Sequence, residues 1–238
     1  MPIKGLTDAA AKFPCIGKLR KGGVKSGNRP GEDLDHFRFD SKDRDAIAVF
    51  KERYGDRPQQ IEVMLPYDTV DECFFTCKEE WSAGGLKHRC DGEFCSALQV
   101  GGLIQRHFAA PVPCPGGCKE VGRLNIVIPV LQRFAYVSCE THSKNDIVNL
   151  HSQLLAVYQE FGSLRRVPFI LTRRPEAIST PSGKNGGRAR REKWMLSIEI
   201  NPEWAQTQFA LMQHQHRTGQ LAGINNVEVI EASVETVK

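Results

Sequence analysis

Four cysteines in the middle of the chain have the spacing of a metal site. Four residues separate Cys90 from Cys95, three separate Cys114 from Cys118, and eighteen lie between the two pairs. Two close pairs joined by a short segment are typical of a zinc ribbon or knuckle, in which each turn supplies two thiolates. We therefore predict a Zn²⁺ site with these four ligands. Because four protein ligands leave no open position for water, the site is expected to be structural.

The residues around these cysteines favour tight turns. Asp91 and Gly92 follow the first cysteine, and proline and glycine residues surround the second pair. Three other interpretations stay open. The four thiols could form two disulfides, or one of the nearby histidines, His88 and His107, could replace a thiolate. Asp91 could also act with Glu93 as an acid pair beside a catalytic metal.

The amino-terminal sequence bears on the choice between a metal and disulfides. Residues 1–13 are polar and lack the apolar core of a secretory signal, and no stretch approaches eighteen apolar residues. We therefore expect a cytoplasmic protein without a membrane span, in which thiols stay reduced and paired cysteines bind metal. The other four cysteines are expected to be buried free thiols. Cys73 and Cys77, four apart on a predicted helix, could also contribute to a second metal site.

Positive charge is concentrated in two segments. The formal net charge is +4, but residues 18–29 hold five basic and no acidic residues, and residues 165–193 hold nine basic and two acidic ones, so the remainder carries −8. Such segregation indicates a surface that faces a polyanion, with cations and glycine-rich backbone near phosphates. The residues predicted to bind nucleic acid are Lys18, Arg20, Lys21, Lys25, Arg29, Arg173, Arg174, Lys184, Arg188, Arg190, Arg191 and Lys193.

Hydrophobic periodicity predicts an α+β fold, with a mainly antiparallel sheet, packed helices and the four-cysteine zinc ribbon or knuckle as an insertion. One helix is expected over Asp43 to Tyr54, from its apolar spacing and the glycine that follows it. Three more are expected to start after Asp68, Ser143 and Asn201, each of which can cap a helix. The helix after Asp68 is expected to run to the glycines at 84–85. Strands are expected at residues 15–20, 36–39, 61–65, 123–128, 134–139, 169–171 and 194–200.

These elements divide the chain into four parts. With 40% hydrophobic residues, 238 residues are enough to bury a sizeable core. Residues 1–85 form the first part of the α+β core and residues 86–120 the zinc-binding insertion. Residues 121–218 complete the core and include a basic hairpin loop at 175–193, and residues 219–238 form a polar tail.

Several short motifs resemble one known family. They are the Lys4–Thr7 segment before a Gly17-Lys18-Leu19 strand, Asp35-His36-Phe37, the Cys90–Glu93 turn and, most specific, the helix start from Thr141 to Leu150. Over about residues 4–204 the chain resembles the phage Gp3-like recombination directionality factor family, whose members often carry the label "hydrolase or metal-binding protein".

The resemblance implies a non-enzymatic accessory protein that binds a serine integrase on DNA and turns recombination towards excision. Combined with the cysteines and the basic segments, it predicts a zinc-stabilised nucleic-acid-binding protein, with DNA expected ahead of RNA. One alternative is a nucleic-acid-binding subunit of a replication, repair or defence complex. Another is a metal-dependent hydrolase in which Asp91, Glu93 and a histidine serve a zinc-bound water. A third is a protein-docking adaptor whose arginine loop is only solvated.

Overall fold

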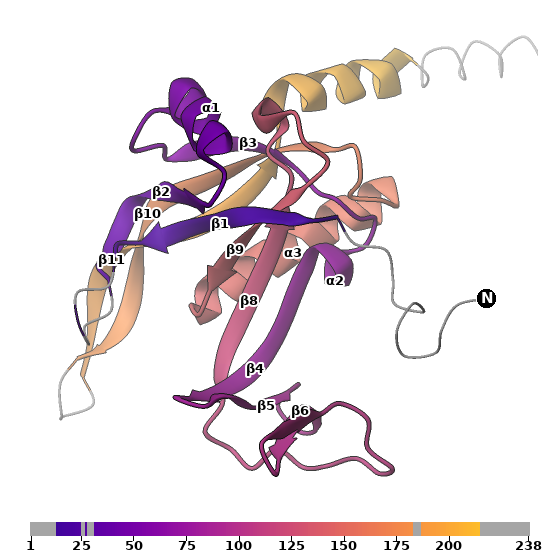
Figure 1. Ribbon diagram of the computed structural model, residues 1–238. Coiled ribbons are helices and arrows are strands. Elements are labelled where there is room, and N and C mark those ends of the chain that lie inside the picture. The colour runs from indigo at the N-terminus through magenta and orange to yellow at the C-terminus, as the bar shows by residue number, and fades with distance from the viewer. Residues whose placement is uncertain (1–12, 25–26, 28–30, 183–186, 215–238) are drawn as a thin grey trace, which may run out of the picture. The chain divides into compact units, whose positions relative to one another are not determined.

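The computed structural model describes residues 13–24, 27, 31–182 and 187–214. The chain divides into two compact units, Met1–Glu199 and Ile200–Lys238. The first unit contains two sheets and the helices that pack on them (Figure 1). Every strand pair whose register is resolved is antiparallel except β1 with β9, which is parallel. The predicted α+β class with a mainly antiparallel sheet is therefore confirmed.

The larger sheet has eight strands in the order β2-β1-β9-β8-β4-β5-β6-β7. Its strands are β1 (Cys15–Gly22), β2 (Asp33–Ser41), β4 (Phe74–Ser82), β5 (Gly85–Cys90), β6 (Cys95–Val100), β7 (Leu103–Gln105), β8 (Lys119–Ile126) and β9 (Tyr136–Thr141). The cysteine-bearing strands β5 and β6 thus continue the main sheet. A short 3-10 helix, η1 (Pro129–Leu131), connects β8 to β9.

The smaller sheet has three strands in the order β11-β10-β3. They are β3 (Gln60–Met64), β10 (Pro168–Ser182) and β11 (Gly187–Ile200). Strands β10 and β11 extend through most of the segment 175–193, which the sequence predicted to be a loop. The basic residues of this segment therefore lie mostly on strands, where alternate side chains point to opposite faces.

The two long helices begin and end where local signals placed them. In α1 (Arg44–Tyr54) the Asp43 side chain accepts a hydrogen bond from the Ala46 amide, and the helix ends at Gly55. In α3 (Lys144–Phe161) the Ser143 hydroxyl accepts from the Asp146 amide. Its C-cap, Gly162, has a φ of 73°, a left-handed conformation that glycine adopts without strain. Apolar spacing for α1, the Ser143 cap for α3 and the glycine after each helix thus predicted these boundaries correctly.

The helix predicted after Asp68 is wrong for most of its length. The helix α2 covers only Val70–Cys73, and the chain then enters β4, which pairs with both β5 and β8. Pairing on two sides outweighs the weak helical spacing of the sequence. The proposed shared helix face of Cys73 and Cys77 is therefore absent. The Cys73 thiol instead lies 3.3 Å from the Tyr67 carbonyl oxygen.

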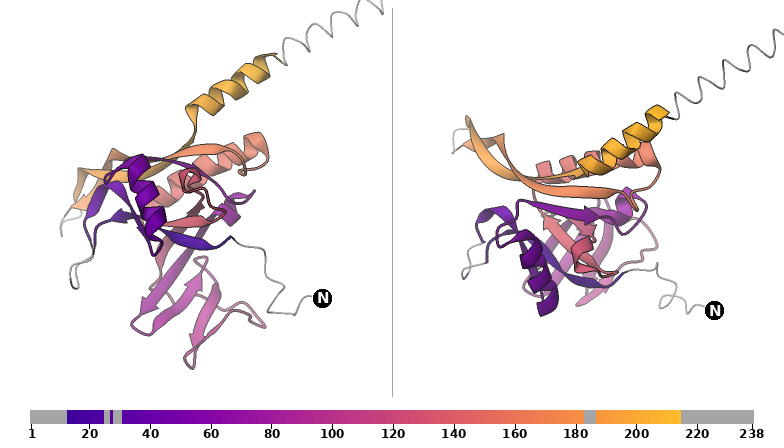
Figure 2. Two further views of the ribbon diagram at one scale, coloured as in Figure 1. Left: turned by 45° about the horizontal axis from the view of Figure 1, so that its top comes forward. Right: turned by 90° about the horizontal axis from the view of Figure 1, so that it is seen from above.

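Helix α3 packs beside β11, as both views in Figure 2 show. Leu150 and Leu154 on this helix are fully buried. The Gln153 side chain accepts a hydrogen bond from the Ile198 amide at 2.9 Å and donates to the Ser197 hydroxyl at 3.1 Å. An edge strand exposes unpaired backbone groups, and the helix side chain satisfies one of them here.

In the second unit, residues 202–214 are helical. The Asn201 side chain accepts hydrogen bonds from the amides of Glu203 and Trp204, which confirms the predicted cap. The predicted tail at 219–238 lies outside the described residues. None of the helices in the described part of the chain combines the length and the apolar character that a membrane span requires.

Candidate functional site

The first cysteine pair lies on the β5–β6 hairpin. Cys90 ends β5, Cys95 begins β6, and the two residues face each other across the ladder. The Asp91 carboxylate closes the turn by accepting hydrogen bonds from the amides of Glu93 and Phe94, both at 2.8 Å. These bonds, the one from Phe94 first, lower the pKa of Asp91. This carboxylate therefore has a turn-forming role, as the Asp-Gly sequence predicts.

The second pair lies on the segment that leads into β8. The Cys114 amide donates to the Glu93 carbonyl at 2.7 Å, and the Cys95 amide donates to the Val112 carbonyl at 2.8 Å. These bonds hold the segment against the β5–β6 turn. The glycine at 116 has a φ of 89°, and its amide lies 3.4 Å from the Cys114 sulfur. The left-handed conformation of Gly116 thus places its backbone N–H group next to the Cys114 thiol.

Three of the four sulfurs form a close group. The Cys118 sulfur lies 3.4 Å from that of Cys90 and 3.4 Å from that of Cys114, and all eight cysteines are free. Two sulfurs bound tetrahedrally to one ion at about 2.3 Å each lie about 3.8 Å apart. The observed separations are close to this value and far above the length of a disulfide bond, about 2.05 Å. The group therefore fits a metal ion better than it fits two disulfides.

A histidine joins this group. The His88 Nε2 atom lies 2.9 Å from the Cys118 sulfur, the side chain is buried, and His88, Cys114 and Cys118 together could hold a metal ion. The other ring nitrogen, Nδ1, lies 3.6 Å from the Glu80 carboxylate. A carboxylate beside the second nitrogen is the usual arrangement around metal-binding histidines. The sequence signal was available, because His88 and Cys90 are two apart on a strand and share a face.

Local contacts set the protonation of the thiols. Burial, followed by the neighbouring thiols, raises the pKa of Cys118, whereas the amide hydrogen bond from Gly116 lowers the pKa of Cys114. The Cys95 sulfur lies 3.8 Å from the Pro113 carbonyl oxygen. The structure thus brings Cys90, Cys114 and Cys118 together with His88. Cys95 pairs with Cys90 across the β5–β6 ladder.

The residues predicted to bind nucleic acid fall into different environments. Lys18, Arg190, Arg191 and Lys193 are exposed. Arg20 pairs with Asp40, and Arg174 pairs with Glu176, in partly exposed ion pairs. Outside the described residues lie Lys25, Arg29 and Lys184, and the side chain of Arg188 also lies outside them.

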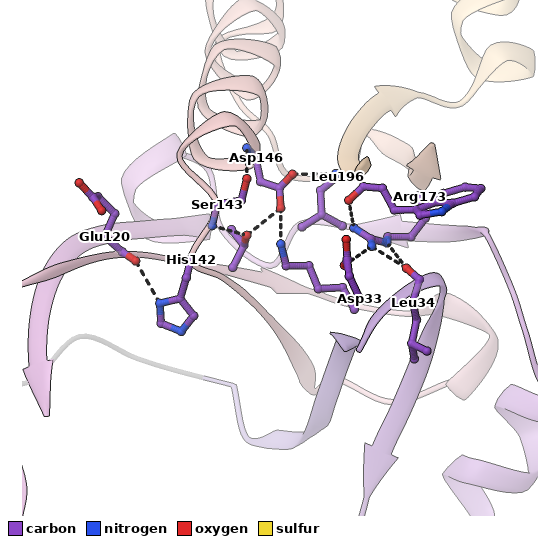
Figure 3. Close-up of polar contacts among 11 residues, drawn as sticks. Asp33, Leu34, Glu120, His142, Ser143, Asp146, Arg173 and Leu196 are labelled. Carbon is purple, nitrogen blue, oxygen red and sulfur yellow. Dashed lines mark hydrogen bonds and ion pairs between the residues drawn. The ribbon is translucent and has the colours of Figure 1, made fainter. Parts of the chain in front are cut away.

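Arg173 has a structural position, which corrects its prediction as a nucleic-acid ligand. Its side chain is fully buried and its guanidinium donates to the Trp194 carbonyl at 2.6 Å and to the Leu34 carbonyl at 2.6 Å. It also pairs with Asp33 at 2.8 Å. Figure 3 shows these bonds, which join β10 to β2 and β11. A guanidinium used in this way is not available to a phosphate.

Lys21 has a comparable role on β1. Its ammonium lies 2.6 Å from the fully buried carboxylate of Asp146, which also accepts hydrogen bonds from the Thr141 hydroxyl at 2.7 Å and the Leu196 amide at 3.0 Å (Figure 3). A buried carboxylate is stable only when its oxygens have partners. The Thr-His-Ser-Lys-Asn-Asp motif therefore builds a junction between β1, β9, α3 and β11.

The family model for "Gp3-like: Recombination directionality factor-like" matches residues 16–201. The chain belongs to this Gp3-like family. The match spans both sheets and the cysteine group, so the family resemblance seen in the motifs is confirmed. Comparisons with curated proteins and with solved structures gave no match.

Proposed function

We propose that this Gp3-like protein is a zinc-stabilised DNA-binding accessory protein without enzymatic activity of its own. In this proposal it acts in the cytoplasm on the complex of a serine integrase with DNA, as a recombination directionality factor. Membership of the family is the observation that carries the proposal. The grouping of His88 with Cys114 and Cys118, and with Cys90 in contact, supports the metal. With four such ligands the zinc would stabilise the fold.

The basic hairpins support the nucleic-acid partner. Strands β1–β2 and β10–β11 end on the same side of the first unit in Figures 1 and 2, and Arg173 bonds one hairpin to the other. The exposed cations Arg190, Arg191 and Lys193 lie on β11 close to its hairpin end. Exposed cations on adjacent hairpins suit contacts to the phosphate backbone, which position a protein without reading sequence.

The test is a salt titration of duplex DNA binding with a double variant, Arg190→Ala and Arg191→Ala. If both guanidinium groups contact phosphates, affinity falls, and the negative slope of log K against log salt becomes about 2 less negative, since each contact contributes about −0.9. The matched control is the double variant Lys51→Ala and Arg53→Ala on α1, which removes the same charge from another surface. Unchanged affinity and slope in the first variant would refute the assignment of the β11 arginines.

Two further measurements on the same sample address the metal and the protein partner. Elemental analysis is expected to find one zinc per chain. A recombination assay with a serine integrase from the same genetic element is expected to show more excision when the protein is added. Zinc without any effect on recombination or DNA binding would instead favour a protein-docking role.

A further inference from the structure

The eight-stranded sheet has a second face that is not part of the core. On one face, registered neighbours such as Phe74, Leu124 and Cys139 are buried and apolar. Their sequence neighbours point the other way, because side chains alternate along a strand. On that other face a cavity of about 900 Å³ spans β1, β9, β8, β4 and β5, which are consecutive neighbours in the sheet. Its lining includes Phe75 and Arg123.

A buried carboxylate holds three of the side chains that line this cavity. Glu79 is fully buried and accepts hydrogen bonds from Arg89 at 2.7 Å, from Arg123 at 2.6 Å and 3.0 Å, and from the Trp81 indole at 2.9 Å. Burial alone would raise the pKa of Glu79, but the bonds from Arg123, Trp81 and Arg89 outweigh it and lower the pKa to about 2. The indole and both guanidinium groups are therefore held in position before any ligand arrives.

The aromatic side chains of the cavity are open to solvent. Trp81 is 59% exposed and Phe75 is 40% exposed, and the Arg89 guanidinium lies 5.3 Å from the centre of the Phe75 ring. Tyr67 and Tyr136 also line the cavity. A guanidinium placed over a ring, beside a second exposed ring, provides planar surfaces that are fixed but uncovered. Large exposed aromatic patches mark binding sites.

The polar groups of the cavity are mostly paired within the protein. Glu140 accepts from Arg123 at 2.8 Å and lies 3.4 Å from His142, and Glu72 bonds to Thr69. The pairing leaves the local charge nearly balanced. A ligand of this surface would therefore be bound by contacts with aromatic rings more than by electrostatic attraction. This favours a planar and weakly charged group as the ligand.

We propose that this cavity binds unpaired bases of single-stranded nucleic acid, which stack on Phe75 and Trp81 beside Arg89. The proposal rests on the proposed nucleic-acid function and adds the form of strand that the protein recognises. Stacking on aromatic side chains tolerates any base, because every base has a π-face. Lys18 on β1 connects the two surfaces, since it lines the cavity and belongs to the basic segment that continues towards the β1–β2 hairpin end.

The test compares labelled oligothymidine with a duplex at several salt concentrations. We expect Phe75→Ala and Trp81→Ala each to weaken oligothymidine binding about tenfold, in the range for one lost base stack, without changing the salt slope. Trp81→Phe keeps a ring and is expected to bind nearly as well as the wild type. The matched control is Phe134→Ala, since Phe134 is 88% exposed and does not line the cavity.

The outcomes separate this proposal from the proposed function. Loss of single-strand affinity in Trp81→Ala, with rescue in Trp81→Phe, supports stacking even if the Arg190 and Arg191 variant behaves normally. Unchanged affinity in Phe75→Ala and Trp81→Ala overturns stacking, whatever the salt slope shows about the hairpins. An equal loss for duplex and oligothymidine also overturns it, because paired bases cannot stack on these rings. Circular dichroism confirms that each variant is folded before it is compared.

Discussion

The clearest prediction concerns Arg173, which the sequence predicted to bind nucleic acid and which is buried in the structure. Its guanidinium is fully buried and bonded to the carbonyl oxygens of Leu34 and Trp194 and to Asp33. Replacement by methionine keeps much of the aliphatic volume but removes every donor. We therefore expect Arg173→Met to lower the free energy of unfolding and to leave the proposed DNA-binding surface unchanged.

The size of the stability loss follows from the polar groups that lose their partner when the Arg173 guanidinium is removed. Each of the two carbonyl oxygens loses a close donor, and an unsatisfied buried acceptor costs about 1–3 kcal/mol. Asp33 is 40% exposed, so water can replace its lost partner at small cost. Removing the guanidinium also removes the free-energy cost of burying its charge. The total loss for the two carbonyl groups is therefore expected in the lower part of its range, which is about 2–6 kcal/mol. We expect a loss of about 3 kcal/mol, at the low end of values for broken buried ion pairs.

The assay is urea denaturation followed by circular dichroism at neutral pH. The matched control is Arg174→Met, the next residue on β10, whose ion pair with Glu176 is about half exposed. Such surface pairs contribute about 0–1 kcal/mol, so the control is expected to stay within that range. A change below about 1 kcal/mol in Arg173→Met would refute the structural role. If Arg173→Met had normal stability but bound DNA more weakly, the original prediction that Arg173 contacts nucleic acid would be supported instead.

Two further predictions concern the metal and the buried carboxylates. Cys118→Ser is expected to lose most bound zinc, measured by elemental analysis, whereas Cys15→Ser, at an exposed thiol, is expected to keep one zinc per chain. The pKa values of Glu79 and Glu140 lie near 2, below the usual 4.3, so their stabilising contribution is complete above about pH 5 and is lost as the pH falls towards 2. Urea denaturation at several pH values should therefore show that the free energy of unfolding falls less steeply with decreasing pH in Glu79→Gln than in the wild type. The substitution leaves the cysteine group unchanged, so the acid loss that this group contributes is the same in both proteins, and equal slopes would contradict this account.

Local chemistry determined the elements that the sequence predicted well. The Ser143 hydroxyl bonds to the amide of Asp146, three residues on, and Gly55 and Gly162 end their helices with bonds to carbonyl groups four residues back. The Asp91-Gly92 turn is likewise closed by bonds between neighbouring residues. Because these interactions are short in sequence, the residue types and their spacing were enough to predict them.

Interactions between distant residues determined the rest. Strand β4 could be read as a helix until its pairing with β5 and β8 was known, since the spacing of Val70, Phe74 and Cys77 fits a helix. Arg173 looks like any exposed arginine in the sequence, yet its partner Asp33 lies 140 residues away. The burial of a charge depends on which partners the fold supplies, and no local pattern encodes those partners. The sequence by itself therefore determined the cysteine pairs, the capped helices and the family, while the tertiary structure decided which cations face solvent and that His88 joins the thiols.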